Sequence, residues 1–158
     1  MPLTRAGEKL VQVIHTQSGA VATGTTIIPY DDTIPQNTEG DEYLTVTITP
    51  KSASNILYIE AIWQGSSSEL ATNLISAAIF QDSTANALAA ITMRSLLASG
   101  DLIIPIRHRM VAGTTASTTF KLRVGGGDTG TTTMNGTSGA RRFGGVMASS
   151  MTVIEVTP

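Results

Sequence analysis

The chain has 158 residues, enough for one domain with a core of ordinary size but not for two. Hydrophobic residues make up 41% of it, which excludes global disorder, while charged residues make up only 14% and 24 Thr and 14 Ser supply much of the polarity. The net charge of -2 excludes a basic field for nucleic acid, and the lack of cysteine excludes disulfides and thiol chemistry. No apolar run approaches the roughly 18 residues of a membrane span, so we expect no membrane partner. Because of the charge we also expect no nucleic-acid partner.

Apolar and polar residues alternate along the first half of the chain, and this pattern predicts strands. The alternation is clearest in Leu44–Ile48. In Ile56–Gln64 apolar residues occupy both phases, which is typical of a strand covered on both faces. The other strands expected in this half are Val11–His15 and Thr25–Tyr30.

The second half continues the pattern, and Leu74–Gln81 again has apolar residues in both phases. The window Ala85–Leu97 is rich in Ala and Leu but lacks a sustained helical face, so we expect one short helix there or none. The glycine-rich segment Gly125–Gly145 predicts a loop or hairpin. Further strands are expected at Leu102–Val111, Thr118–Val124 and Val146–Val156.

About eight strands without alternating helices predict an all-β fold whose sheets are antiparallel. A sandwich, a jelly roll or a barrel would each satisfy this pattern, and we predict an antiparallel β-sandwich of jelly-roll type. We expect an N-terminal arm at residues 1–10 and a single knob domain at 11–158. The strands that are apolar in both phases need cover on both faces, which favours an oligomer.

No group of residues predicts catalysis. The two histidines, His15 and His108, each lie inside an expected strand, and no serine stands in a nucleophile-elbow spacing. Gly125, Gly127 and Gly130 match a dinucleotide-binding pattern, but no helix follows them to hold a pyrophosphate. We therefore expect no enzyme activity, no catalytic residues and no cofactor.

Three other signals in the sequence have simple structural explanations. The acids between Asp31 and Glu42 could bind calcium or form a solvated turn; without the alternation of an EF-hand loop we expect a turn and no metal. Arg141 and Arg142 could clamp an anion, but adjacent residues of a strand point to opposite faces. The glycosylation sequence at Asn135 matters only in a eukaryotic secretory pathway, which nothing in the sequence indicates.

Several segments of the sequence resemble a module that recurs in tailed-phage virion proteins. The resemblance covers Val11–Thr49, Phe80–Ala90, Met110–Phe120 and Gly139–Pro158. It implies a trimeric β-rich knob of jelly-roll type without catalytic residues. It also implies a structural protein on the surface of a phage particle, made in the host cytoplasm.

Two roles follow from this resemblance. The first is a capsid cement or decoration protein that binds the major capsid protein, or other virion proteins, as a homotrimer and stabilises the head shell. The alternative is a receptor-binding tip, or a knob of a head or tail fibre, that contacts the host surface. We expect partner binding in the N-terminal arm and the acidic turn, with these residues: Pro2, Leu3, Arg5, Lys9, Asp31, Asp32, Glu39, Asp41 and Glu42.

Overall fold

The computed structural model describes residues 7–68 and 74–158. Within these residues the chain forms twelve strands and one short 3-10 turn, η1 at Phe143–Gly145. The strands are β1 Leu10–Ser18, β2 Ala22–Gly24, β3 Asp41–Ile48, β4 Ile56–Ser67, β5 Leu74–Gln81, β6 Ala89–Arg94, β7 Leu102–Val111, β8 Thr118–Gly126, β9 Thr132–Met134, β10 Gly136–Thr137, β11 Ala140–Arg141 and β12 Ser149–Val156. No helix among the described residues is long and apolar enough to cross a membrane.

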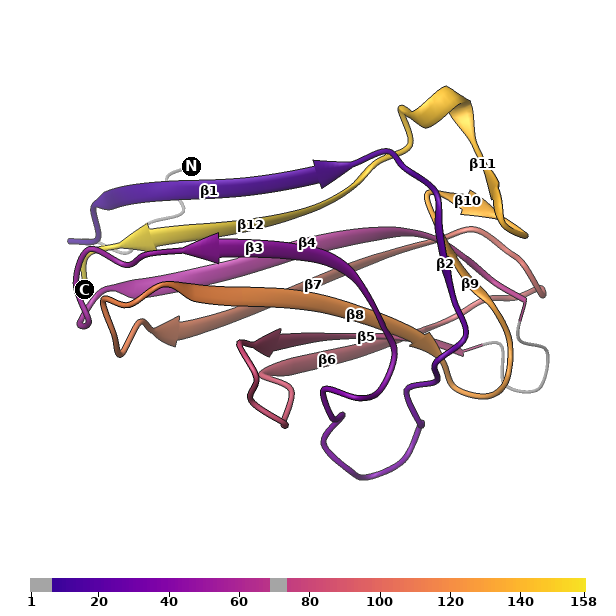
Figure 1. Ribbon diagram of the computed structural model, residues 1–158, viewed down its shortest axis with the longest axis horizontal. Coiled ribbons are helices and arrows are strands. Elements are labelled where there is room, and N and C mark those ends of the chain that lie inside the picture. The colour runs from indigo at the N-terminus through magenta and orange to yellow at the C-terminus, as the bar shows by residue number, and fades with distance from the viewer. Residues whose placement is uncertain (1–6, 69–73) are drawn as a thin grey trace.

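The strands build two antiparallel sheets that pack face to face (Figure 1). The six-stranded sheet has the order β1-β12-β4-β9-β2, and β7 pairs with β4 beside this path. The four-stranded sheet has the order β3-β8-β5-β6, and β10 pairs with β11 in a separate small hairpin. The predicted all-β fold with antiparallel sheets of jelly-roll type is confirmed.

Two segments differ from the prediction. Thr25–Tyr30 was expected to be a strand, but it joins no sheet and instead crosses the outer face of the four-stranded sheet, where the Ile28 N–H donates to the Gly126 carbonyl at 3.0 Å. Within Ala85–Leu97, where the sequence predicts a short helix or none, there is no helix, but Ala89–Arg94 forms the unpredicted strand β6, which pairs with β5. Thr25–Tyr30 is held by a strand about a hundred residues later in the chain, whereas β6 pairs with the strand that directly precedes it. The residues of a segment do not by themselves record which neighbour it meets.

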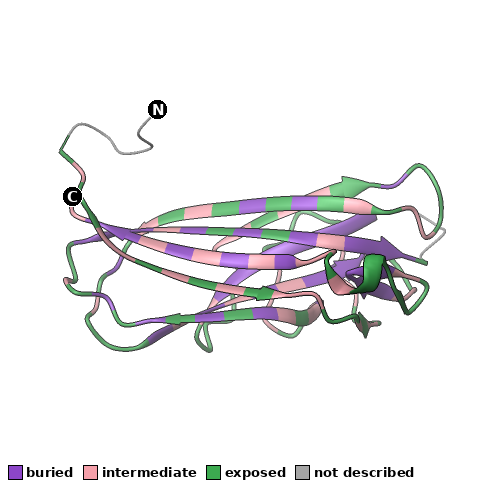
Figure 2. Ribbon diagram, turned by 90° about the horizontal axis from the view of Figure 1, so that it is seen from above, coloured by how far each residue is buried: buried purple, intermediate pink, exposed green. Residues whose placement is uncertain are grey.

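The core lies between the two sheets. Its largest side chains are Trp63 on β4 and Phe120 on β8, both fully buried. The rings of Tyr43 and Trp63 meet edge to face with centroids 6.1 Å apart, and burial raises the pKa of Tyr43 to about 12. Figure 2 shows burial alternating along several strands, as expected when one face of each strand packs on this core.

The outer face of the four-stranded sheet is covered by the chain itself. Ile28 packs there with Ala78, Phe80 and Ala87 in a second, smaller cluster. The covering segment runs between β2 and β3 and is held by main-chain bonds such as Asn37 N–H to the Ala85 carbonyl at 2.8 Å. β5 is therefore buried on both faces, as its sequence predicts.

β4 meets that expectation only in part. Its inner residues are buried, but Glu60 is exposed and Ile62 is 44% exposed on the outer face of the six-stranded sheet. Nothing within the described chain covers Ile62. The two strands with the same sequence signal thus have different surroundings.

Candidate interaction surfaces

The predicted binding arm lies largely outside the described residues, which begin at Gly7; this applies to Pro2, Leu3 and Arg5. Lys9 is described, and its main chain bonds to Thr157, because the Lys9 carbonyl accepts from the Thr157 N–H at 2.9 Å. This contact extends the pairing of β1 with β12 by one step beyond Leu10. Lys9 therefore sits beside the C-terminal end of the sandwich.

Glu8 anchors the start of the described chain on the six-stranded sheet. Its carboxylate accepts from the Tyr58 hydroxyl at 3.2 Å and lies 3.8 Å from the Arg109 guanidinium. Arg109 in turn stacks 5.6 Å from the centre of the Tyr58 ring. The segment that leads to the arm is thus fastened to the outer face of this sheet.

Asp31 and Asp32 are the predicted acids that face solvent. Asp31 closes its own turn by accepting from the Thr33 N–H at 2.9 Å, and hydrogen bonds from the Thr33 hydroxyl and main chain lower the pKa of Asp31. Tyr30 and Ile34 flank these acids and are 65% and 55% exposed. The result is a lateral surface that combines carboxylates with exposed apolar side chains.

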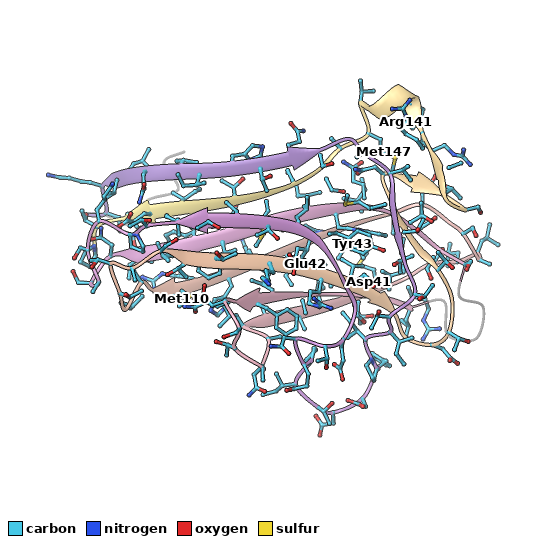
Figure 3. The ribbon with its side chains drawn as sticks, in the orientation of Figure 1. Asp41, Glu42, Tyr43, Met110, Arg141 and Met147 are labelled. Atoms are coloured by element: carbon cyan, nitrogen blue, oxygen red, sulfur yellow. The ribbon has the colours of Figure 1, made fainter. Side chains whose placement is uncertain are left out.

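The other three predicted acids bind inside their own chain. Glu39 accepts from the Gln36 N–H at 2.9 Å, and Asp41 accepts from the Thr26 N–H at 2.8 Å. Glu42 lies 3.2 Å from Lys121, and Figure 3 shows Asp41 and Glu42 beside Tyr43 on the body of the sandwich.

Electrostatics agree with this internal role. Burial by itself would raise the pKa of Glu42, but the hydrogen bond from Thr45 and the charges of Lys121 and Arg123 outweigh it and lower the pKa. Across the described parts of the chain, no three acidic or histidine side chains gather closely enough to hold a metal ion. The acidic turn is therefore divided between an outward pair and three internal partners.

The outer face of the six-stranded sheet is a larger surface, which we call the open face. It carries exposed apolar side chains from three strands: Val13 at 48%, Ile62 at 44%, Ile103 at 59% and Val111 at 53%. The register places Glu60 opposite Arg107 on the same face. A hollow of about 390 Å³ beside them is lined by Tyr58, Glu60, Arg107, His108, Arg109, Ile154 and Val156.

A third surface lies at the end of the sandwich farthest from the described chain ends, where the β6–β7 loop meets the segment from β10 to β12 (Figure 1). We call these segments the tip loops. They are tied together, because the Thr137 hydroxyl donates to Asp101 and the Ser138 hydroxyl donates to the Ser99 hydroxyl at 3.5 Å. Figure 3 places Arg141 and Met147 here, away from Asp41 and Glu42.

Asn135 supports the tip loops from below and is fully buried. Its side-chain amide donates to the carbonyls of Ser18 and Ala20 at 2.7 and 2.9 Å, and its oxygen accepts from the Ser149 hydroxyl at 2.8 Å. In the folded chain this asparagine is a structural residue and is not accessible to glycosylation. The sequence predicts a loop or hairpin in this glycine-rich segment, and its Asn135-Gly136 pair suits a turn with positive backbone angles; Asn135 has a φ of 56° and the segment contains the β10–β11 hairpin.

The two packed antiparallel sheets form a jelly-roll β-sandwich. The solved structure of Eiger TNF from S. frugiperda matches it with a TM-score of 0.56 and 8% identity over 93% of each chain. The infectious bursal disease virus VP2 subviral particle matches with a TM-score of only 0.35 and 10% identity, over 94% of this chain and 39% of that one, which is too weak to extend the first likeness.

The sequence profile of the Pgp3 C-terminal domain matches residues 26–158. The chain belongs to this family. No curated protein sequence matches it. This family is not the tailed-phage knob module that segments of the sequence resemble.

Proposed function

We propose that the chain is a non-enzymatic homotrimeric knob of a virion that is attached through its terminal end and binds a surface through its tip loops. The observation that carries this proposal is the polarity of the molecule. The described chain enters at Gly7 and ends at Pro158 on one side, while the tip loops lie on the opposite side (Figure 1). A module held by its terminal end therefore presents the tip loops outward.

The open face supports self-association. Four aliphatic side chains that are 44 to 59% exposed lie on one side of a sheet, and burying them against other copies removes their apolar area from water. Closed rotational symmetry is the usual solution for identical chains. The number three comes from the resemblance to virion knob modules, and a trimer with its three tips on one side would bind a surface multivalently.

Replacing Ile62 by Glu tests the trimer. A carboxylate placed in a buried apolar interface loses hydration without gaining a partner, so we expect the mass measured by light scattering to fall from trimer to monomer. Ile34→Glu is the matched control, because Ile34 is 55% exposed but lies on the lateral surface. A trimeric mass for the Ile62→Glu protein would contradict the interface.

The proposal includes no catalysis, and the described residues support this. His15 shares a hydrogen bond of 2.8 Å with the Thr152 hydroxyl rather than with a carboxylate. His108 is half-buried, and burial lowers the pKa of His108. Within the described residues, His15 and His108 have no hydrogen bond to an acidic side chain.

Capsid cement is the second candidate function. It is favoured by the lateral surface, where Asp31, Asp32, Tyr30 and Ile34 offer charge and apolar area to a neighbouring shell subunit. A cement protein stabilises the shell by mass action. In this role the partner would be the major capsid protein, and the arm residues would contribute to the contact.

One pair of measurements separates the two functions. Particles lacking the protein should keep their thermal stability but lose host adsorption if the chain is a binding knob. They should lose their contents at a lower temperature if it is cement. An electron micrograph of particles labelled with a specific antibody gives the position independently.

A further inference from the structure

We propose that the tip loops dock onto an anionic lipid surface, with their apolar side chains entering the interface and two arginines binding lipid phosphates. The proposal rests on the binding-knob function above, which it deepens by naming the chemistry of the partner. The expectation of no membrane partner came from the absence of a spanning segment, and shallow insertion of loops needs no such segment.

The first observation is exposure. Four apolar side chains stand almost fully in solvent on the tip loops: Leu96 at 93%, Leu97 at 72%, Phe143 at 78% and Val146 at 85%. Single exposed apolar residues are ordinary, but these four are more exposed than every other large apolar side chain of the described chain and share one end of it. No described residue buries these four side chains.

The second observation is the backbone at Phe143. This residue has φ of 49°, and Gly144 and Gly145 follow with φ of 65° and 99°. A side chain other than glycine is strained in this left-handed region. The loop thus holds an aromatic ring outward at a cost, and a partner that receives the ring would offset it.

The third observation is charge. Arg141 and Arg142 are exposed beside Phe143, and neither forms an ion pair with a described residue. They need not clamp one anion together, because β11 ends at Arg141 and a lipid surface presents a separate phosphate to each side chain. The neighbouring acid, Asp101, accepts a hydrogen bond from Thr137. One guanidinium group can bind two oxygens of a phosphate at once. Aromatic and aliphatic side chains beside it suit the boundary between lipid headgroups and acyl chains.

The shape of the surface favours lipid over a folded protein partner. The apolar side chains stand on two separate loops, and a hollow of about 340 Å³ beside Phe143 and Val146 is also lined by Asp101, Leu102 and Met147. A protein would need a pocket matched to each protruding side chain. A fluid lipid surface adapts to them, and three parallel tips would insert together.

Vesicle co-flotation tests the proposal with the intact protein. We expect binding to phosphatidylcholine vesicles that contain phosphatidylglycerol, weak binding to pure phosphatidylcholine, and release by salt. Phe143→Ser should weaken binding about tenfold, and each of Arg141→Gln and Arg142→Gln about fivefold. Light scattering of each variant checks that it remains a trimer, so failure of docking is distinguished from failure of assembly.

Matched controls lie elsewhere on the molecule. Tyr30→Ser removes an aromatic side chain that is 65% exposed on the lateral surface, and Lys51→Gln removes an exposed cation from the loop between β3 and β4. Both should bind vesicles like the parent protein. Absence of binding to anionic vesicles, equal loss in the controls, or binding only to vesicles that carry host membrane proteins would overturn the proposal.

Discussion

The outer faces of the two sheets show two ways of dealing with the same sequence signal. Both β4 and β5 carry apolar residues in both phases, which implies cover on both faces. On the four-stranded sheet the chain provides that cover itself, with Ile28 only 2% exposed above Ala78 and Phe80. On the six-stranded sheet Ile62 and its neighbours stay open. A strand with apolar residues in both phases thus indicates that both of its faces become buried. It does not indicate whether the same chain or another copy covers the second face.

The largest expected effect comes from closing the space beneath the covering segment. A Cβ on Gly125 would lie 2.5 Å from the Thr26 carbonyl oxygen and 2.8 Å from the Ile28 nitrogen, both backbone atoms. We expect Gly125→Ala to lower the free energy of unfolding by about 4 kcal/mol. Gly144→Ala is the control, because its Cβ meets nothing and only the positive φ costs about 1 kcal/mol. Equal melting temperatures for the two variants would mean that the segment lifts off easily.

Truncating one isoleucine on each face sharpens the comparison. Ile28→Ala should cost about 3 kcal/mol at every protein concentration, because a buried side chain is removed from within one chain. Ile62→Ala should change the folding of a single chain little, but it should lower the melting temperature at high protein concentration, where the parent protein is a trimer, and not at high dilution, where both proteins are monomers. Thermal unfolding over a range of concentrations measures both, and identical concentration dependence would contradict the contrast.

A smaller effect is expected at Glu155, which lies on the inner side of the six-stranded sheet and is fully buried. It accepts from the Asn55 amide at 2.6 Å and the Lys51 N–H at 2.8 Å, and Gln12 and Ser52 donate as well. Burial by itself would raise the pKa of Glu155, but hydrogen bonds from Asn55, Gln12 and the main chain outweigh it, and the pKa falls below 4.5.

The folded-state pKa is therefore below the unfolded one, so this carboxylate stabilises the fold above about pH 4.5 and loses that contribution as the pH falls through the folded pKa. Glu155→Gln should cost about 2 kcal/mol at neutral pH, because an amide group would face the donors. The difference from the parent protein should shrink in acid. Glu42→Gln, with a side chain 37% exposed, is the control and should cost less than about 1 kcal/mol. Urea unfolding of the parent protein and of both variants at several pH values measures these differences in the free energy of unfolding.

The sequence predicts a strand well where the residues of that strand are enough to favour it, and poorly where the position of a segment depends on a distant residue. Leu74–Gln81 and Leu102–Val111 form strands with the predicted bounds, because their own residues make a strand favourable on either face. Thr25–Tyr30 has the same β-prone composition, yet it crosses a sheet face. Its place depends on Gly125, which leaves room for it about a hundred residues later in the chain.

The same reasoning applies to the surfaces. The acidic turn was visible in the sequence, but the partners Lys121 and Arg123, which occupy Glu42, come from a strand far along the chain. The tip loops were hidden for another reason. Phe143 and Val146 look like ordinary core residues in the sequence, and only the left-handed backbone and the position beyond the sheets expose them.

The buried Asn135 also bears on the chemical ageing of the protein. Asn135 and Gly136 form the only Asn-Gly pair of the chain, the dipeptide in which the following backbone nitrogen most easily attacks the side-chain amide and converts it to an acid. Here the amide is held on three sides by Ser18, Ala20 and Ser149, and no solvent reaches it. The fold therefore protects the Asn135 side-chain amide from this conversion for as long as the tip loops stay closed over it.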